Sequence, residues 1–392
     1  MKTNTVCPNC HTPGMEIFYT IEQVPVHSVV LLKTREQALN FTTGDIALGL
    51  CHHCGFVSNT AFDHSLHDYA VDYEATQSFS PTFNRFHTRL AQDIIDRHDL
   101  HDKTVIEIGC GQGEFLIMLA EMGPNKGIGF DPAYRNEPLE TEAKDRLEFY
   151  ADFYGEKYTH IQGDFVACKM TLEHIDQTLE FMQTVRRSIA DQRETTVFFQ
   201  IPNGEYVFGD MAFWDVYYEH CSYFTAPSLR YLFEQSGFDV LQTRTDYDDQ
   251  YLMIEAKPGD IPTETLASPA GLADIEAQVA NFKVAAAKKR ADWQETLQGY
   301  ARDGKKVAIW GGGSKGVAFL TTLGIHDQIP YIVDINPRKH GMYMAKTGQE
   351  IVSPEFLMTY QPDVVIVMNP IYCPEIQAQL DEMGIQAELV SV

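Results

Sequence analysis

The chain has 392 residues, of which 44% are hydrophobic and 22% charged, as in folded globular proteins with two or three domains. Its formal net charge of −25 argues against nucleic acid or an anionic membrane as the main partner, because both require a field of Lys and Arg side chains. No run approaches the roughly 20 apolar residues of a membrane span, and the first residues lack the apolar core of a signal peptide. We therefore expect a cytoplasmic monomer or homodimer whose partner is a small molecule.

Changes in composition divide the chain into four segments. Residues 1–75 are dotted with Cys and His, whereas residues 76–258 alternate strand-like and helical runs. This alternation predicts βαβ units and a mainly parallel sheet. Residues 259–303 contain an Ala-, Gln- and Lys-rich stretch that predicts one long helix, and residues 304–392 start a second α/β pattern. We expect a small N-terminal module, an α/β domain, a helical linker and a second α/β domain at the C-terminal end.

The N-terminal segment carries two Cys-x-x-Cys motifs. Cys7 and Cys10 form the first, and Cys51 and Cys54 form the second. Four thiolates in two such turns suit a tetrahedral zinc ion, and four protein ligands leave no open position for chemistry. We therefore predict structural Zn²⁺ at these cysteines. Two unrelated pairs of reduced cysteines, or a redox motif, are the alternatives.

A glycine loop follows the first strand-like run of the α/β domain. Residues 103–116 have the order strand, loop, helix, with the spacing Glu-x-Gly-x-Gly-x-Gly at Glu107, Gly109, Gly111 and Gly113. Glycine lets the backbone turn sharply and lets a ligand approach it. A dinucleotide is one candidate ligand, but the carboxylate of Glu107 would repel a pyrophosphate. It suits a ligand with a cationic amino-acid end, such as S-adenosylmethionine.

Two further acids follow the next two strand-like runs. Asp131 ends the run 126–131, where an acid can accept hydrogen bonds from both ribose hydroxyls. Asp152 follows the run 147–150, and we expect it near the adenine amino group. Either acid alone could be a solvated loop carboxylate. Together with the glycine loop they predict an S-adenosylmethionine site.

These features together resemble the sugar C-methyltransferase family of antibiotic and cell-surface deoxysugar pathways, over nearly the whole chain. The resemblance implies an N-terminal zinc module (1–75), a class I methyltransferase domain with a seven-stranded, doubly wound α/β sheet (76–258), a helical linker (259–303) and a C-terminal Rossmann-like domain (304–392). It also implies S-adenosylmethionine at the glycine loop, with residues 165–175 beside the sulfonium. A keto-sugar linked to a nucleotide is the implied acceptor.

Residues 215–224 are rich in Tyr, Glu and His and follow the strand-like run 196–201. Methylation at carbon requires removal of a proton next to a carbonyl and a donor for the resulting enolate. The segment resembles the family motif Tyr-x-Glu-His-x-Ser-Tyr-Phe, in which Tyr217, Glu219 and His220 match the catalytic residues. We expect His220 as the base, Glu219 as its partner or an alternative base, and Tyr217 as a ligand of the enolate or a substrate hydroxyl. The alternative is a loop that only packs.

Five residues are candidates for acceptor binding. Tyr73 lies in the place of the family's Tyr- and Ser-rich lid, and His174 lies near the expected methyl group. In the C-terminal domain, Ser314 and Lys315 belong to a glycine loop that could hold a substrate phosphate at a helix N-terminus, and Asn369 follows a strand-like run. A loop without a ligand is about equally compatible with the pattern, and the spacing Gly-x-Gly-x-x-Gly also fits a nicotinamide cofactor.

We therefore predict a C-methyltransferase that uses S-adenosylmethionine and an enolate mechanism. Methyl transfer to oxygen or nitrogen of another small metabolite is the first alternative. A protein that binds the cofactor without turnover is the second. The stretch 24–28, Val-Pro-Val-His-Ser, differs from the Asn-rich turn that is common at this place in the family.

Overall fold

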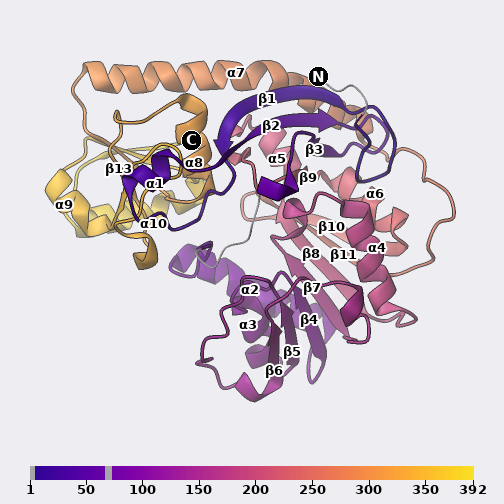
Figure 1. Ribbon diagram of the computed structural model, residues 1–392. Helices are drawn as coiled ribbons and strands as arrows, with labels where there is room; N and C mark the ends of the chain where they lie inside the picture. Colours follow the sequence, from indigo (N-terminus) through magenta and orange to yellow (C-terminus); the bar gives the residue numbers. More distant parts are fainter. Residues whose placement is uncertain (1–4, 67–72) are drawn as a thin grey trace.

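The computed structural model describes residues 5–66 and 73–392, which form three sheets. A four-stranded antiparallel sheet begins the chain, a seven-stranded sheet forms the centre, and a five-stranded parallel sheet ends it. The long helix α7 (Leu272–Arg302) runs along β1 (Glu16–Pro25) and reaches the C-terminal domain (Figure 1). Within the described ranges, no helix combines the length and apolar character needed to cross a membrane.

The central sheet has the strand order β10-β11-β8-β7-β4-β5-β6. All neighbours are parallel except β11, which runs antiparallel to both β10 and β8. This sheet confirms the predicted seven-stranded class I methyltransferase fold. The strands are β4 (Thr104–Ile108), β5 (Lys126–Phe130), β6 (Leu147–Tyr150), β7 (Phe165–Lys169), β8 (Thr196–Pro202), β10 (Phe238–Asp246) and β11 (Tyr251–Pro258).

Helices cover both faces of the central sheet. The helices α2 (Pro81–His98) and α3 (Glu114–Met122) share an apolar core with one face, and α4 (Thr178–Ile189) and α6 (Ala226–Gln235) share a core with the other. Successive residues of one strand face opposite sides, so both faces need apolar side chains and the central strands are buried along their length. The cavity at the carboxyl ends of the parallel strands is also lined by residues of these helices, among them His87 of α2 and Phe115 of α3.

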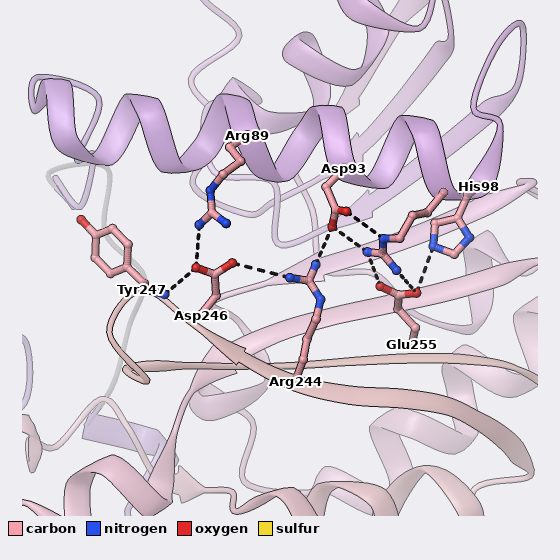
Figure 2. Close-up of polar contacts among 8 residues, drawn as sticks. Arg89, Asp93, His98, Arg244, Asp246, Tyr247 and Glu255 are labelled. Carbon is pink, nitrogen blue, oxygen red and sulfur yellow. Dashed lines mark hydrogen bonds and ion pairs between the residues drawn. The ribbon is translucent and has the colours of Figure 1, made fainter.

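Charged side chains fix α2 against the two strands at the sheet edge (Figure 2). Glu255 of β11 is buried and lies 2.7 Å from Arg97 Nη1 and 3.0 Å from His98 Nε2. Asp93 binds Arg97 along the helix and Arg244 on β10, at 2.9 Å each. This network of alternating charges holds the helix that precedes the glycine loop.

The N-terminal sheet has the order β1-β2-β3-β9, with β2 (Thr43–Leu50) and β3 (Val57–Asn59). Its last strand, β9 (Ser222–Tyr223), comes from the middle of the chain and lies near the end of the predicted catalytic segment. The short helix α1 (Arg35–Leu39) lies beyond β1, and Leu32 forms a bridge to Tyr343 of the C-terminal domain. The N-terminal segment therefore touches both other domains.

The C-terminal domain is a parallel sheet with the order β14-β13-β12-β15-β16, as expected for a Rossmann-like arrangement. Its strands are β12 (Val307–Trp310), β13 (Tyr331–Val333), β14 (Glu350–Val352), β15 (Val364–Val367) and β16 (Glu388–Ser391). Its helices are α8 (Ser314–Leu323), α9 (Leu357–Tyr360) and α10 (Cys373–Glu382), and the remaining helix, α5 (Gly204–Gly209), follows β8.

The Glu255 network makes stability depend on pH. Burial alone would raise the pKa of Glu255, but hydrogen bonds from His98 and Arg97 outweigh it and lower this pKa to about 2. The stabilisation is therefore complete above the unfolded value of about 4.3 and is lost as the pH falls toward 2. We expect Glu255→Gln to lower the free energy of unfolding at pH 7 by about 2 kcal/mol. Urea unfolding at pH 7 and at pH 3 measures this loss.

Asp93→Asn is the matched control, because the carboxylate of Asp93 is 39% exposed and its ion pairs are screened by solvent. We expect a loss of at most about 1 kcal/mol for this variant. If Glu255→Gln kept the acid dependence of the wild type between pH 4.5 and pH 2, the network would not be its source.

Candidate functional site

A large cavity of about 1140 Å³ lies between the central and C-terminal domains. Its lining includes the glycine loop of the central domain, the predicted catalytic segment and the glycine loop of the C-terminal domain. All five predicted acceptor-binding residues also line it, namely Tyr73, His174, Ser314, Lys315 and Asn369. The fold therefore brings residues that are far apart in sequence to one space.

The first glycine loop has the backbone geometry that its sequence predicts. Gly109, Gly111 and Gly113 have φ angles of 69°, 56° and 85°, which favour glycine. A Cβ atom at Gly109 would lie 1.9 Å from the Thr171 hydroxyl oxygen. The amides of Gly109 and Cys110 donate to the carbonyl of Phe130, at 2.8 and 3.1 Å, which ties the loop to β5. The loop thus needs glycine both for its turn and for close packing.

The three predicted cofactor acids differ in their surroundings. Glu107 is 3% exposed, its Oε2 has no hydrogen-bond partner, and burial raises its pKa to about 7 although Lys169 opposes this. Asp131 accepts hydrogen bonds from the amides of Gly111 and Ala133, at 2.8 Å each, so one of its oxygens supports the loop itself. Both acids line the cavity beside the glycine loop.

Asp152 also lines the cavity, but its carboxylate is engaged by its own loop. It forms an ion pair with Lys157 and accepts a hydrogen bond of 2.8 Å from the Tyr158 hydroxyl. These two hydrogen bonds lower the pKa of Asp152. The adenine amino group would therefore compete with Lys157 and Tyr158 for this carboxylate. The sequence could have indicated this competition, because Lys157 follows Asp152 by only five residues.

The predicted catalytic segment is anchored by large buried side chains. Trp214 and Tyr218 are each 1% exposed, and the Tyr218 hydroxyl accepts a hydrogen bond of 2.8 Å from the Asp63 amide. The Asn59 amide of the N-terminal module donates to the carbonyl of Cys221 at 2.9 Å. The residues between these anchors, 217–220, are therefore held from both sides.

Tyr217, which is half-buried, and His220, which is buried, form a pair. The Tyr217 hydroxyl lies 3.0 Å from His220 Nε2, and the His174 ring meets the His220 ring edge-on at 4.9 Å. Burial lowers the pKa of His220 well below 6.5, and the charges of His174 and Lys315 add to this effect. Burial also raises the pKa of Tyr217 well above 10. At neutral pH the imidazole can therefore accept a proton, and the phenol can donate a hydrogen bond.

The side chain of Glu219 pairs with residues other than His220, whereas we expected Glu219 to be the partner of His220 or an alternative base. Its carboxylate lies 3.0 Å from His27 Nδ1 and accepts a hydrogen bond from Ser28. Burial alone would raise the pKa of Glu219, but the hydrogen bonds of His27 and Ser28 and the charge of His174 lower it, so the carboxylate is ionised. Tyr217 takes the place next to His220 that we expected for Glu219. The hydroxyl of Ser28 also lies 2.8 Å from that of Ser314.

Glu173 is a buried carboxyl that the sequence did not single out. It is 1% exposed, and neither of its oxygens has a hydrogen-bond partner. Burial raises its pKa to about 8, so it is mostly protonated at neutral pH. The ligand atoms of Glu173, His174 and His220 lie within 4.8 Å of one another, so this cluster could also hold a metal ion. His174 is oriented by a contact of 3.0 Å between its Nδ1 and the Glu219 carbonyl.

The C-terminal domain closes the cavity through a few polar contacts. Lys315 Nζ lies 2.6 Å from Asp215 and 3.1 Å from the Gln250 side-chain oxygen. The amides of Gln250 and Asn369 exchange two hydrogen bonds of 2.9 and 3.0 Å. Asp215 and Gln250 were not among the predicted site residues, although Asp215 begins the catalytic segment. Both anchor predicted acceptor residues to the central domain.

A second polar cluster beside the cavity is centred on Glu74. This buried carboxylate contacts Arg338 at 3.1 Å, Arg135 at 3.4 Å and the Asn336 amide at 3.2 Å. Both arginines line the cavity, although the chain as a whole is acidic. A carboxylate that is shared by two guanidinium groups leaves part of their donors for another anion. The predicted residue Tyr73 precedes Glu74 and bridges to Val30.

The four cysteines of the N-terminal module are buried together, away from the cavity. Their sulfur atoms all lie within 4.8 Å of one another, with 3.7 Å between Cys7 and Cys54 and 3.6 Å between Cys10 and Cys51. A tetrahedron with Zn–S bonds of about 2.3 Å has edges of about 3.8 Å, so the sulfurs fit zinc. The Thr178 hydroxyl donates to the Pro8 carbonyl at 3.2 Å, which fastens the first motif to the start of α4.

Comparison with known proteins shows which protein families this chain resembles. Residues 82–243 match the family model of a methyltransferase domain, and residues 268–389 match that of a C-methyltransferase C-terminal domain. The chain is also 29% identical over 309 residues to the C-methyltransferase NovU of Streptomyces niveus, which covers 74% of this chain and 72% of that protein. Together these matches support a C-methyltransferase family for this chain. This methyltransferase depends on S-adenosylmethionine, so the predicted family and enzyme class are confirmed.

Other similarities cover less of this C-methyltransferase. Ribosomal protein L11 methyltransferase of Escherichia coli O8 (strain IAI1) is 39% identical over 69 residues, which is 16% of this chain and 24% of that protein. An O-methyltransferase family protein from Burkholderia thailandensis matches with a TM-score of 0.36 and 18% identity, over 45% of this chain and 59% of the other. A 1,6-didemethyltoxoflavin-N1-methyltransferase from the same organism matches with a TM-score of 0.33 and 15% identity, over 52% and 96%.

The glycine loop yields a test of the cofactor site. We expect Gly109→Ala to weaken binding of S-adenosylhomocysteine, the product form of the cofactor, at least about tenfold, because the new methyl group meets Thr171 and the residue has a positive φ. Gly209→Ala is the control, since nothing lies within 4 Å of its Cβ position. Calorimetric titration of both folded variants measures the affinities. Wild-type affinity in Gly109→Ala would place the cofactor elsewhere.

Proposed function

We propose that this C-methyltransferase transfers a methyl group to a carbon next to the carbonyl of a keto-sugar, which is carried on a nucleoside diphosphate. The observation that carries the proposal is the pair of half-buried Tyr217 and buried His220 on the wall of the cavity, with a neutral imidazole and a protonated phenol. Transfer to an alcohol or amine needs only a base, whereas carbon also needs a donor for the developing enolate.

In this mechanism the His220 imidazole removes the proton from the carbon next to the carbonyl, and the Tyr217 hydroxyl donates a hydrogen bond to the enolate oxygen. The cofactor supplies an electrophilic methyl group on a positively charged sulfur. The enolate carbon would take up that methyl group as the carbon–sulfur bond breaks, and His220 would release its proton to solvent. Glu219, held ionised by His27 and Ser28, stabilises the positive charge that His220 acquires. Glu173, as a neutral acid, can donate a hydrogen bond to the acceptor.

A nucleotide-linked acceptor is supported by the chemistry of the far cavity wall. Cationic side chains of Lys315, Arg135 and Arg338 line the cavity although the chain has a net charge of −25. The N-terminus of α8 also faces this wall, and no side chain caps it. A helix N-terminus beside cations suits a diphosphate. The cavity also exceeds the roughly 300–1,000 Å³ typical of a site for one small ligand.

The enolate step is tested with His220→Gln. We expect it to lower turnover of a nucleotide-linked keto-sugar at least about 100-fold and to abolish exchange of the α-proton with deuterated water. Binding of S-adenosylhomocysteine should stay within about twofold of the wild type, because the cofactor does not need this base. Mass spectrometry of the product and proton NMR of the acceptor give the two readouts.

The exposed His160→Gln is the control for this test and should behave as the wild type. A methylated product without any deuterium exchange would favour oxygen or nitrogen as the acceptor atom. Cofactor binding without product from a panel of nucleotide-linked keto-sugars would favour another acceptor or a protein without turnover.

We also propose that Cys7, Cys10, Cys51 and Cys54 hold a structural zinc ion. We expect about one zinc per chain by elemental analysis of the purified protein. Cys51→Ser should lose this zinc and lower the midpoint of thermal unfolding by several degrees, because a structural zinc site contributes folding free energy. Cys373→Ser, which changes a half-buried cysteine outside the cluster, should change neither. A zinc-free wild type with the same midpoint would contradict the proposal.

A further inference from the structure

Lys169 is a cation whose position is fixed beside the first glycine loop. It ends β7, where the preceding residue Cys168 pairs with Ile108 of β4, so that Lys169 lies next to Gly109. Ala167 pairs with Glu107, and side chains alternate along a strand, so Lys169 and Glu107 point to the same face of the sheet. Both side chains line the cavity. The strand register therefore places one acid and one base at the same end of the site.

The ammonium group of Lys169 is held by two aromatic side chains. Its Nζ lies 2.5 Å from His87 Nε2 and 3.8 Å from the centre of the Phe115 ring, and the ring of His87 stacks on that of Phe115 at 4.9 Å. Burial and the charge of Lys169 lower the pKa of His87 to about 2, so the histidine is neutral and accepts a hydrogen bond. Burial also lowers the pKa of Lys169, to about 8, so the amine is still mostly protonated at neutral pH.

No carboxylate oxygen in the described part of the chain lies within 4.0 Å of Lys169 Nζ, so the charges of Glu107 and Glu114 act on this cation only from a greater distance. Placing a charge in such a site is costly unless a counter-ion is supplied. Glu107 lacks a donor in turn, because one of its buried carboxylate oxygens has no hydrogen-bond partner. Two side chains of opposite charge thus face the same space without forming an ion pair with each other.

We propose that Lys169 binds the α-carboxylate of the cofactor's amino-acid end, while Glu107 binds its α-ammonium group. The amino-acid end of S-adenosylmethionine is a zwitterion, so it supplies the anion that Lys169 lacks and the cation that Glu107 lacks. His87 and Phe115 are positioning residues, which keep the ammonium group aimed into the cavity. The inference rests on the cofactor of the proposed function but not on its acceptor.

The test compares two ligands that differ only in the carboxylate. These are S-adenosylhomocysteine and its decarboxylated analogue, which keeps the amine and the adenosine. Calorimetry of the full-length wild type should give about 10- to 100-fold tighter binding of S-adenosylhomocysteine, as expected for a hydrogen bond between charged groups. In Lys169→Met this ratio should fall to near one, and Lys169→Arg should restore most of it. The ratio is the readout, because general damage to the site would weaken both ligands alike.

Lys289→Met is the matched control, because Lys289 also lies over an aromatic ring, that of Trp214 at 4.3 Å, but is not part of the cavity lining. It should keep the wild-type ratio. An unchanged ratio in Lys169→Met would overturn the assignment, as would equal affinity of the wild type for the two ligands. If the wild type bound neither ligand, the assignment of the cofactor site itself would be wrong. Tight, carboxylate-dependent binding without any C-methylated product would leave the inference standing and count against the proposed acceptor.

Discussion

The pairing of β3 with β9 is the contact on which the candidate active site depends. It consists of only two residue pairs, Val57 with Tyr223 and Ser58 with Ser222. The strand β3 follows shortly after the second cysteine motif, and the strand β9 follows shortly after residues 217–220. The four-cysteine cluster, although distant from the chemistry, therefore sets where one end of the catalytic segment lies. The rings of Phe56 and Phe224, 4.8 Å apart, extend the same joint with apolar contact.

Burial raises the pKa of a carboxyl group in the cavity and lowers that of a histidine. The hydrogen-bond partners of each group then decide its protonation state. Glu173 has no hydrogen-bond partner and takes up a proton, whereas the equally buried Glu219 stays ionised because His27 and Ser28 bind it. His220, with a tyrosine hydroxyl as its hydrogen-bonding neighbour, stays neutral. One small region thus contains a neutral acid, an anion and a neutral base, which is the separation of protonation states that acid–base chemistry near pH 7 requires.

The sequence predicts local features of the site well and distant partners poorly. The cysteine motifs, the glycine loop and the three-domain order rest on spacings within short stretches, and such spacings reflect the chemistry of a turn or a strand end directly. The partner of Glu219 is His27, which is 192 residues away and lies in a stretch that departs from the family pattern. Nothing local reveals that contact, because it arises only when the N-terminal sheet joins β9. Lys169 is hidden for the same reason, since its contact with His87 comes from a helix packed on another strand.

The hydroxyl contact between Ser28 and Ser314 has a consequence for how such enzymes diversify. It connects the first and last domains directly, through the residue that also hydrogen-bonds the Glu219 carboxylate. The C-terminal domain is therefore no independent cassette: a chimera that exchanged it alone would change the surroundings of Glu219 as well as the wall that meets the acceptor. Recombination that preserves activity has to transfer the two ends of the gene together, although they flank a cofactor domain that could remain unchanged between them.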